Sequence, residues 1–113
     1  MGLPWVRLDA GFYCNAKVLQ LLAEPGGHRA LVAYVASLTY SGQQGTDGFI
    51  PQLALPFIHA RPADAVRLVK AEFWDIAQGG WVIHDWAEYQ PSSEEQQKRS
   101  ARARARAQAR WQT

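Results

Sequence analysis

The last sixteen residues of the chain, 98–113, limit the possible fold more than any other segment. They carry six basic side chains and no acidic one, so their formal charge is +6. Alternating alanine and arginine over residues 101–109 favours a helix but provides no apolar stripe. A segment without such a stripe cannot pack into a core, so the core must come from earlier residues. We therefore expect a folded domain at 1–90 and an Arg-rich helical or disordered arm at 91–113.

The residues before this basic segment, 1–97, have the opposite net charge and the composition of a folded domain. Residues 1–97 hold six basic side chains and all ten acidic ones, a net charge of −4. Of the 113 residues of the whole chain, 48% are hydrophobic, which suits one domain with a modest core. The one cysteine, Cys14, excludes a disulfide framework within the chain and a zinc site built on several cysteines.

Two features of the sequence bear on localisation. No apolar run approaches the roughly 18 residues of a membrane-spanning helix. The N-terminal sequence MGLPWVRLDA lacks the apolar core of a signal peptide. We expect a cytoplasmic protein with no membrane partner.

Periodicity, caps and turn residues predict the order of elements. Asn15 is a good N-cap for a helix at 16–23, and the alternation over 5–8 suggests a short strand before it. The elements expected after these are a central buried helix at 28–40, a loop at 41–48, a brief strand at 49–50, a helix at 51–58, a tight connection at 59–61 and a helix at 63–73. Two β-prone runs, 75–77 and 81–83, then flank Gln78-Gly79-Gly80 and predict a hairpin whose glycines adopt positive φ.

This order of elements is typical of a winged helix-turn-helix. The predicted fold class is therefore α+β, a winged helix-turn-helix with a basic C-terminal helical arm. In that fold the helix at 63–73 can enter a major groove while the helix at 51–58 holds its angle. A small α+β domain with no DNA role is the alternative, because a fold does not determine a function.

The expected groove helix and the hairpin supply the first candidate DNA contacts. If Val66, Val69 and Phe73 form the buried face of the helix, Arg67 and Lys70 lie outward or beside it, with Asp64 on the same side. Arg67 can then pair with a guanine edge or a phosphate, whereas Lys70 and Arg61 more readily meet phosphates. Gln78, at the wing tip, can reach a phosphate. The alternatives are ordinary solvated charges and a turn with no contact.

The arm supplies the remaining candidates. On a helix, four arginines at i, i+3, i+7 and i+11 form one stripe that can follow a phosphate backbone: Arg99, Arg102, Arg106 and Arg110. Lys98 lies beside this stripe, and Arg104 lies off it. Arg-rich arms bind both DNA and RNA, and a solubilising tail is the alternative. Trp111 is the aromatic residue that no core position accounts for.

Three stretches of the sequence carry a family resemblance: WVRLDAGFYCNAKVL, TDGFIP and WDIAQGGWVIHDWAEYQPS. With the basic segment after YQPS, they resemble the small winged-helix DNA-binding proteins of actinobacterial phages and prophages. They are also similar to the N-terminal domains of phage replisome-organiser and replication-initiator proteins. The resemblance implies a winged helix and DNA binding in the bacterial host cytoplasm, at the nucleoid. It implies replication initiation or transcription regulation less specifically.

The remaining polar residues do not suggest an enzyme. His28, His59 and His84 lack the spacing of metal ligands, so neither a metal nor a cofactor is expected. His84-Asp85 resembles an acid–base pair but has no nucleophile or oxyanion hole, and we expect a hydrogen-bonded structural pair at the wing base.

The leading hypothesis is a non-enzymatic protein that binds double-stranded DNA. In this hypothesis the arm supplies most of the affinity. The alternative is an adaptor whose acidic body binds a replication or transcription protein, such as a helicase loader, while the arm tethers it to nucleic acid. A third, weaker hypothesis is an RNA-binding arm on an inert scaffold.

Overall fold

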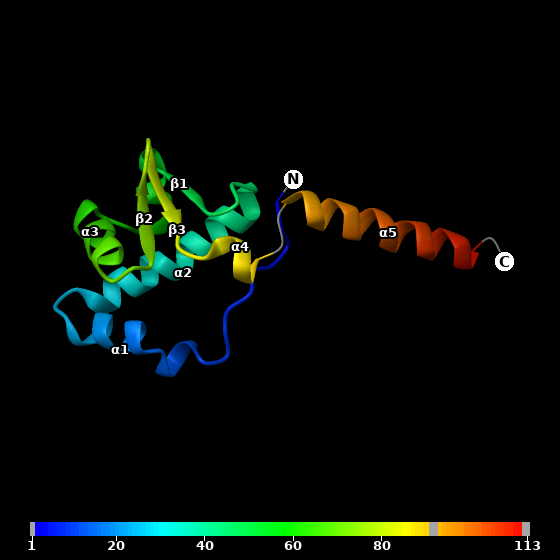
Figure 1. Ribbon diagram of the computed structural model, residues 1–113. Coiled ribbons are helices and arrows are strands. Elements are labelled where there is room, and N and C mark those ends of the chain that lie inside the picture. Colours follow the sequence, from blue (N-terminus) through cyan, green and yellow to red (C-terminus); the bar gives the residue numbers. More distant parts are fainter. Residues whose placement is uncertain (1, 91–92, 112–113) are drawn as a thin grey trace.

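A small antiparallel sheet packs beside a long helix in this α+β protein, and a second long helix extends from the body (Figure 1). The computed structural model describes residues 2–90 and 93–111; in the last helix it describes the side chains of Lys98 and residues 101–110. The helices are α1 (Ala16–Ala23), α2 (Gly27–Gln44), α3 (Pro62–Lys70), α4 (Trp86–Tyr89) and α5 (Ser93–Trp111), with 3-10 helices η1 (Phe12–Cys14) and η2 (Gln52–Ile58). The strands are β1 (Phe49–Pro51), β2 (Trp74–Ala77) and β3 (Gly80–Ile83).

The sheet has the order β1-β3-β2, and both strand pairs are antiparallel. The hairpin expected around Gln78-Gly79-Gly80 is confirmed, with Trp74 opposite Ile83. Of the two glycines only Gly79 has positive φ (+82°), so the expectation for Gly80 was wrong. Gly80 instead provides space, because a Cβ there would collide with the carbonyl oxygen of Ile50 on β1. A missing side chain at Gly80 therefore allows β1 to join the sheet.

Helix α2 is central, as expected, but it is longer than predicted. It continues to Gln44 through the predicted loop and ends at Gly45, whose φ of +70° is that of a C-cap glycine. Small residues dominate its buried face, which holds Gly27, Ala30, Ala33, Ser37, Leu38, Ser41 and Gly42. Val35, in the middle of the helix predicted to be buried, is exposed. These small residues allow close approach: a Cβ on Gly42 would collide with Val6, and Ser37 Oγ accepts a hydrogen bond from Trp74 Nε1 (3.3 Å).

The predicted cap of α1 is confirmed, whereas the predictions for residues 5–8 and 51–58 differ from the structure. Asn15 caps α1 as expected, its Oδ1 accepting from the backbone N–H of Lys17 at 2.8 Å. Residues 5–8 form no strand. The segment 52–58 is a 3-10 helix rather than an α-helix, and it contains Pro56, which has no N–H to donate. Pro51 precedes it as the N-cap residue and lies in β1.

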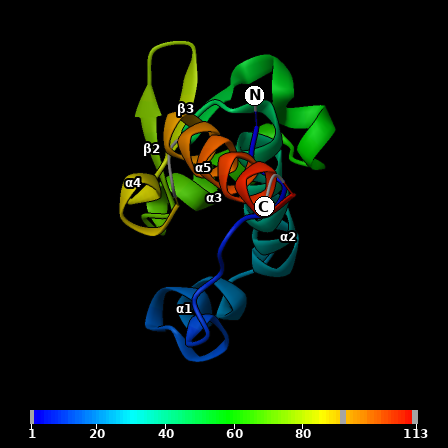
Figure 2. The same ribbon diagram turned by 90° about the vertical axis from the view of Figure 1, so that its right-hand side faces the viewer.

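Helix α5 extends away from the body, at the end of the molecule opposite α3 (Figures 1 and 2). Residues 101–110 are exposed on every side of this helix. The helical form of the arm is therefore confirmed over Ser93–Trp111. A capping role for Ser92, and any contact of the Trp111 side chain, fall outside the described part of the chain. None of the described helices is long and apolar enough to cross a membrane.

Candidate nucleic-acid interface

Helix α3 is rotated relative to the sequence expectation. Its buried face consists of Asp64, Ala65 and Leu68, whereas Val66 is 67% exposed. The expected face of Val66, Val69 and Phe73 is therefore wrong for Val66, and Asp64 is not on the outward side. Asp64 can be buried because it is paired: its Oδ2 accepts from the backbone N–H of Arg61 at 2.8 Å, which also caps the helix.

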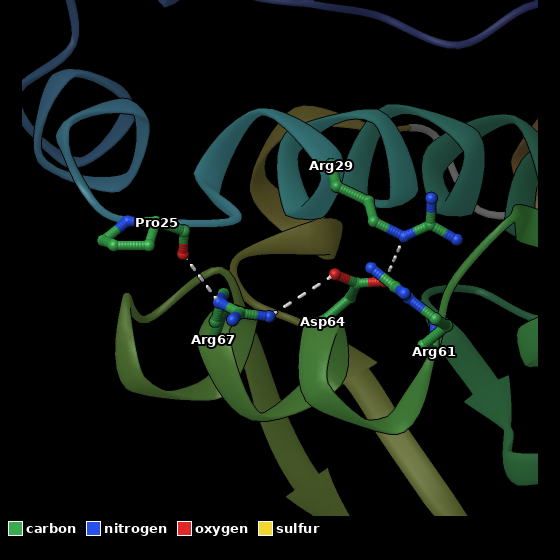
Figure 3. Close-up of polar contacts among 5 residues, drawn as sticks. All are labelled: Pro25, Arg29, Arg61, Asp64 and Arg67. Carbon is green, nitrogen blue, oxygen red and sulfur yellow. Dashed lines mark hydrogen bonds and ion pairs between the residues drawn. The ribbon is translucent and has the colours of Figure 1, made fainter.

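Three guanidinium groups surround the buried carboxylate of Asp64 (Figure 3). Arg29 Nε on α2 lies 3.4 Å from Asp64 Oδ2, and Arg61 Nε, from the residue preceding α3, lies 3.9 Å from the same oxygen. Arg67 Nη1 lies 3.7 Å from Asp64 Oδ1. The Asp64 side chain is fully buried, whereas those of Arg29 and Arg61 are 50% and 62% exposed. We call Arg29, Arg61 and Arg67 the arginine cluster.

Arg67 connects α3 to the turn between α1 and α2. Its Nε donates to the carbonyl oxygen of Pro25 at 3.0 Å, and its side chain is only 33% exposed (Figure 3). The next residue, Gly26, has φ of +78°, and a Cβ there would lie 2.7 Å from the Arg67 guanidinium carbon. The guanidinium therefore occupies space that a side chain at position 26 would take. Arg67 lies toward the body rather than on the outward surface of α3.

The outward surface of α3 consists of Ala63, Val66 and Lys70, which repeat at helical spacing. Of the three basic residues predicted for this region, Arg61 and Lys70 are thus exposed and Arg67 is partly buried. Gln78 is exposed in the turn between β2 and β3. This surface can offer an aliphatic contact and a few cations, but no arginine at its centre.

The arm presents its cations separately from α3. Lys98, Arg102, Arg104, Arg106 and Arg110 are exposed on α5. Arg99 lies on the same helix, and its side chain is outside the described residues. Because α5 and α3 lie at opposite ends of the molecule, the structure brings Arg61 and Arg67 together but keeps the arm apart from them (Figure 1).

Sequence reasoning missed Arg29. It is the third residue of α2, far from α3 in sequence, and the packing of α2 on α3 places it beside Asp64. Asp64, at the third position of α3, predicts a cap at the start of that helix. It does not reveal that an arginine from α2 lies beside the same carboxylate.

His84, at the base of the β2–β3 hairpin, forms its hydrogen bond with Asp75 and not with the expected partner Asp85, which it contacts only as an ion pair. Its Nδ1 lies 3.0 Å from Asp75 Oδ2 and its Nε2 lies 3.3 Å from Asp85 Oδ2. The hydrogen bond that Asp75 accepts from the ring raises the pKa of His84 above its ordinary value, with a further contribution from the charge of Asp85. Among the described residues, no three His, Cys, Asp or Glu side chains are grouped to hold a metal ion.

A comparison of the chain with protein-family models, with curated proteins and with solved structures finds no match.

Proposed function

We propose that this protein is a non-enzymatic binder of double-stranded DNA, in which a winged helix-turn-helix body carries a basic helical arm. The exposed arm is the observation that carries the proposal. Residues 101–110 contain four arginines and no acidic residue, and all of them are exposed on α5. Such a helix can exchange condensed counterions for its own cations along a phosphate backbone.

The arrangement of the body supports the winged-helix part of the proposal. The order α2, β1, η2, α3, β2, β3 and the sheet order β1-β3-β2 are compatible with a winged helix-turn-helix and support this assignment. In this assignment α3 is the groove helix and the β2–β3 hairpin is the wing. The exposed side chains of Ala63 and Val66 suit contact with thymine methyl groups, and Arg61 and Lys70 suit flanking phosphates.

The distribution of charge assigns non-specific affinity and sequence preference to different segments of the chain. Residues 1–97 have a net charge of −4 and residues 98–113 have +6, so non-specific affinity resides mainly in the arm. Any sequence preference then resides in α3. The family resemblance carries the biological setting, which is phage or prophage replication initiation or transcription regulation.

Salt dependence of DNA binding tests the proposal on the full-length chain. Replacing Arg102, Arg104 and Arg106 by Gln removes three charges, and helix propensity changes little. We expect the slope of log K against log salt to become shallower by about 1.8 from Arg102 and Arg106 on the stripe, and by about 2.7 if Arg104 also meets a phosphate, at about 0.9 for each phosphate contact. A matched variant with Lys at the same three positions keeps the charge and should keep the slope. Equal slopes for all three proteins would contradict a role of the arm in DNA binding.

An adaptor remains the second candidate, and one observation favours it. Leu53 and Phe57, on η2, are 88% and 77% exposed, and the centre of the α3 surface is Val66. Exposed apolar side chains of this size suit a protein partner. The adaptor predicts equal affinity for every duplex sequence, whereas the winged-helix assignment predicts a preferred sequence. Selection of bound fragments from genomic DNA, followed by sequencing, distinguishes the two.

A further inference from the structure

The arginine cluster carries more positive charge than its buried partner neutralises. Three guanidinium groups face one carboxylate, in a body whose overall charge is negative. Asp64 is a poor match for all of them, because its Oδ2 already accepts the backbone N–H of Arg61. The side-chain distances from Arg29 and Arg61, 3.4 and 3.9 Å, exceed the roughly 2.7–2.9 Å of a charge-assisted hydrogen bond. These two guanidiniums therefore keep donors available.

Exposure separates the members of the cluster. Arg67 Nε donates a hydrogen bond to the Pro25 carbonyl oxygen, and the side chain is one-third exposed, so its role is structural. Arg29 and Arg61 are at least half exposed, and no hydrogen bond from either side chain occurs within the described residues. Asp64 lies beneath them and holds both guanidiniums near one point, which reduces the entropy lost when they bind a common acceptor.

The position of the pair identifies the acceptor. Arg61 immediately precedes α3, so the pair lies at the helix end with the positive partial charge of the dipole. Arg61 is also two residues before Ala63, which is exposed on the outward surface of α3. An anion bound there flanks any groove that this helix enters. A guanidinium fork matches the two non-bridging oxygens of a phosphodiester.

We propose that Arg29 and Arg61, held beside the buried carboxylate of Asp64, bind one phosphodiester group of the DNA backbone and set the position of α3 in the groove. The proposal rests on the DNA-binding function proposed above. It adds a contact from α2, an element not otherwise assigned to the interface, and makes Asp64 a positioning residue.

The test uses full-length chains in which two charges are removed at either of two places. Replacing Arg29 and Arg61 by Gln removes one phosphate contact, so it should make the salt slope shallower by about 0.9 and weaken binding by up to roughly eightfold at 0.1 M salt. The control replaces Arg7 and Lys17 by Gln; these residues line a different hollow, beside Tyr34 and His84. It loses the same charge and should keep the slope of the unaltered chain. The single variant Arg29→Gln changes only an exposed position of α2, so it controls for loss of folding in the double variant. It should show about half of the change in slope.

The outcomes separate the two proposals. If the unaltered chain binds duplex DNA and the Arg29/Arg61 variant keeps its slope, the phosphodiester site is wrong and the proposed function stands. If the Arg7/Lys17 control loses as much as the Arg29/Arg61 variant, general charge accounts for the effect and the site is again wrong. If the unaltered chain shows no salt-dependent binding to duplex DNA, the proposed function fails and the site fails with it.

Discussion

The side-chain amide of Gln90 pairs with the backbone of Arg7 through two hydrogen bonds. Arg7 N–H donates to Gln90 Oε1 at 2.8 Å, and Gln90 Nε2 donates to the Arg7 carbonyl oxygen at 2.7 Å. Gln90 is only 6% exposed and is the last described residue before α5. The pair therefore joins the N-terminal segment to the point where the chain leaves the body.

Replacement of Gln90 by Ala tests this connection. It leaves one backbone donor and one backbone acceptor of Arg7 unpaired, and we expect a loss of about 1–3 kcal/mol in the free energy of unfolding. Gln43→Ala, at an exposed position of α2, is the matched control and should change stability little. Urea unfolding measures both. The salt slope of DNA binding should be unchanged because no charge is altered. Equal stability of the two variants would contradict a structural role for the pair.

Two neighbouring glycines of the hairpin should respond differently to alanine. At Gly80 the added Cβ collides with the Ile50 carbonyl, so β1 must move and the cost lies at the upper end of roughly 1–3 kcal/mol or beyond. At Gly79 the nearest atom is 3.9 Å away, and only the positive φ is penalised, by about 1 kcal/mol. Thermal unfolding should therefore rank Gly80→Ala below Gly79→Ala. The reverse order would show that turn conformation, rather than strand pairing, limits the hairpin.

Arg67→Ala should act on the fold before it acts on DNA. The substitution removes the contact with Pro25 and one of the cations around the buried Asp64, and we expect a loss of about 1–3 kcal/mol in stability. Lys70→Ala, on the exposed surface of α3, should leave stability nearly unchanged. Below the melting temperature, Arg67→Ala should weaken binding to specific and scrambled duplexes by the same factor. A selective loss on the specific duplex would show that Arg67 reads a base.

His84 makes stability depend on pH in a stated direction. The hydrogen bond with Asp75 is the largest of the effects that raise the pKa of His84, and the charges of Asp85 and Asp75 raise it further. Partial burial of the ring and the charge of Lys17 oppose this rise. The stabilisation is therefore complete below the unfolded pKa of about 6.5 and is lost as pH rises through the higher folded pKa. NMR titration of the ring should show a raised pKa that Asp75→Asn brings back toward its ordinary value. An unchanged titration in Asp75→Asn would contradict this cause.

The sequence predicted the features that local chemistry determines. Asn15 caps α1 and Gln78-Gly79-Gly80 turns the hairpin, because cap and turn preferences act within a few residues. Features that depend on packing between distant segments were missed. A buried face containing Asp64 breaks the hydrophobic pattern of α3, and the backbone N–H of Arg61 together with the arginine cluster makes it tolerable. Gly42 was read as a loop residue, whereas its lack of a side chain makes room for Val6.

The distance between α3 and the arm predicts how affinity depends on duplex length. The two elements lie at opposite ends of a molecule whose longest dimension is 61 Å (Figure 1). At 3.4 Å per base pair, a straight duplex of roughly 18 base pairs is long enough to reach both elements. If both elements bind one duplex, affinity should rise steeply up to about that length and then level off, since 3.4 Å per base pair fixes the reach. Fluorescence anisotropy on a series of duplexes of one sequence measures the curve.

The variant with Gln at Arg102, Arg104 and Arg106 is the control for this series. With the arm neutralised, only the contacts of the body remain, and the curve should level off at a shorter duplex than for the unaltered chain. The variant with Lys at the same positions should follow the unaltered chain because it keeps the charge. If all three proteins level off at the same short length, the arm and α3 do not bind one duplex together. In that case the salt series separates two explanations: an arm that still steepens the salt slope engages a second duplex, and an arm that does not takes no part in DNA binding.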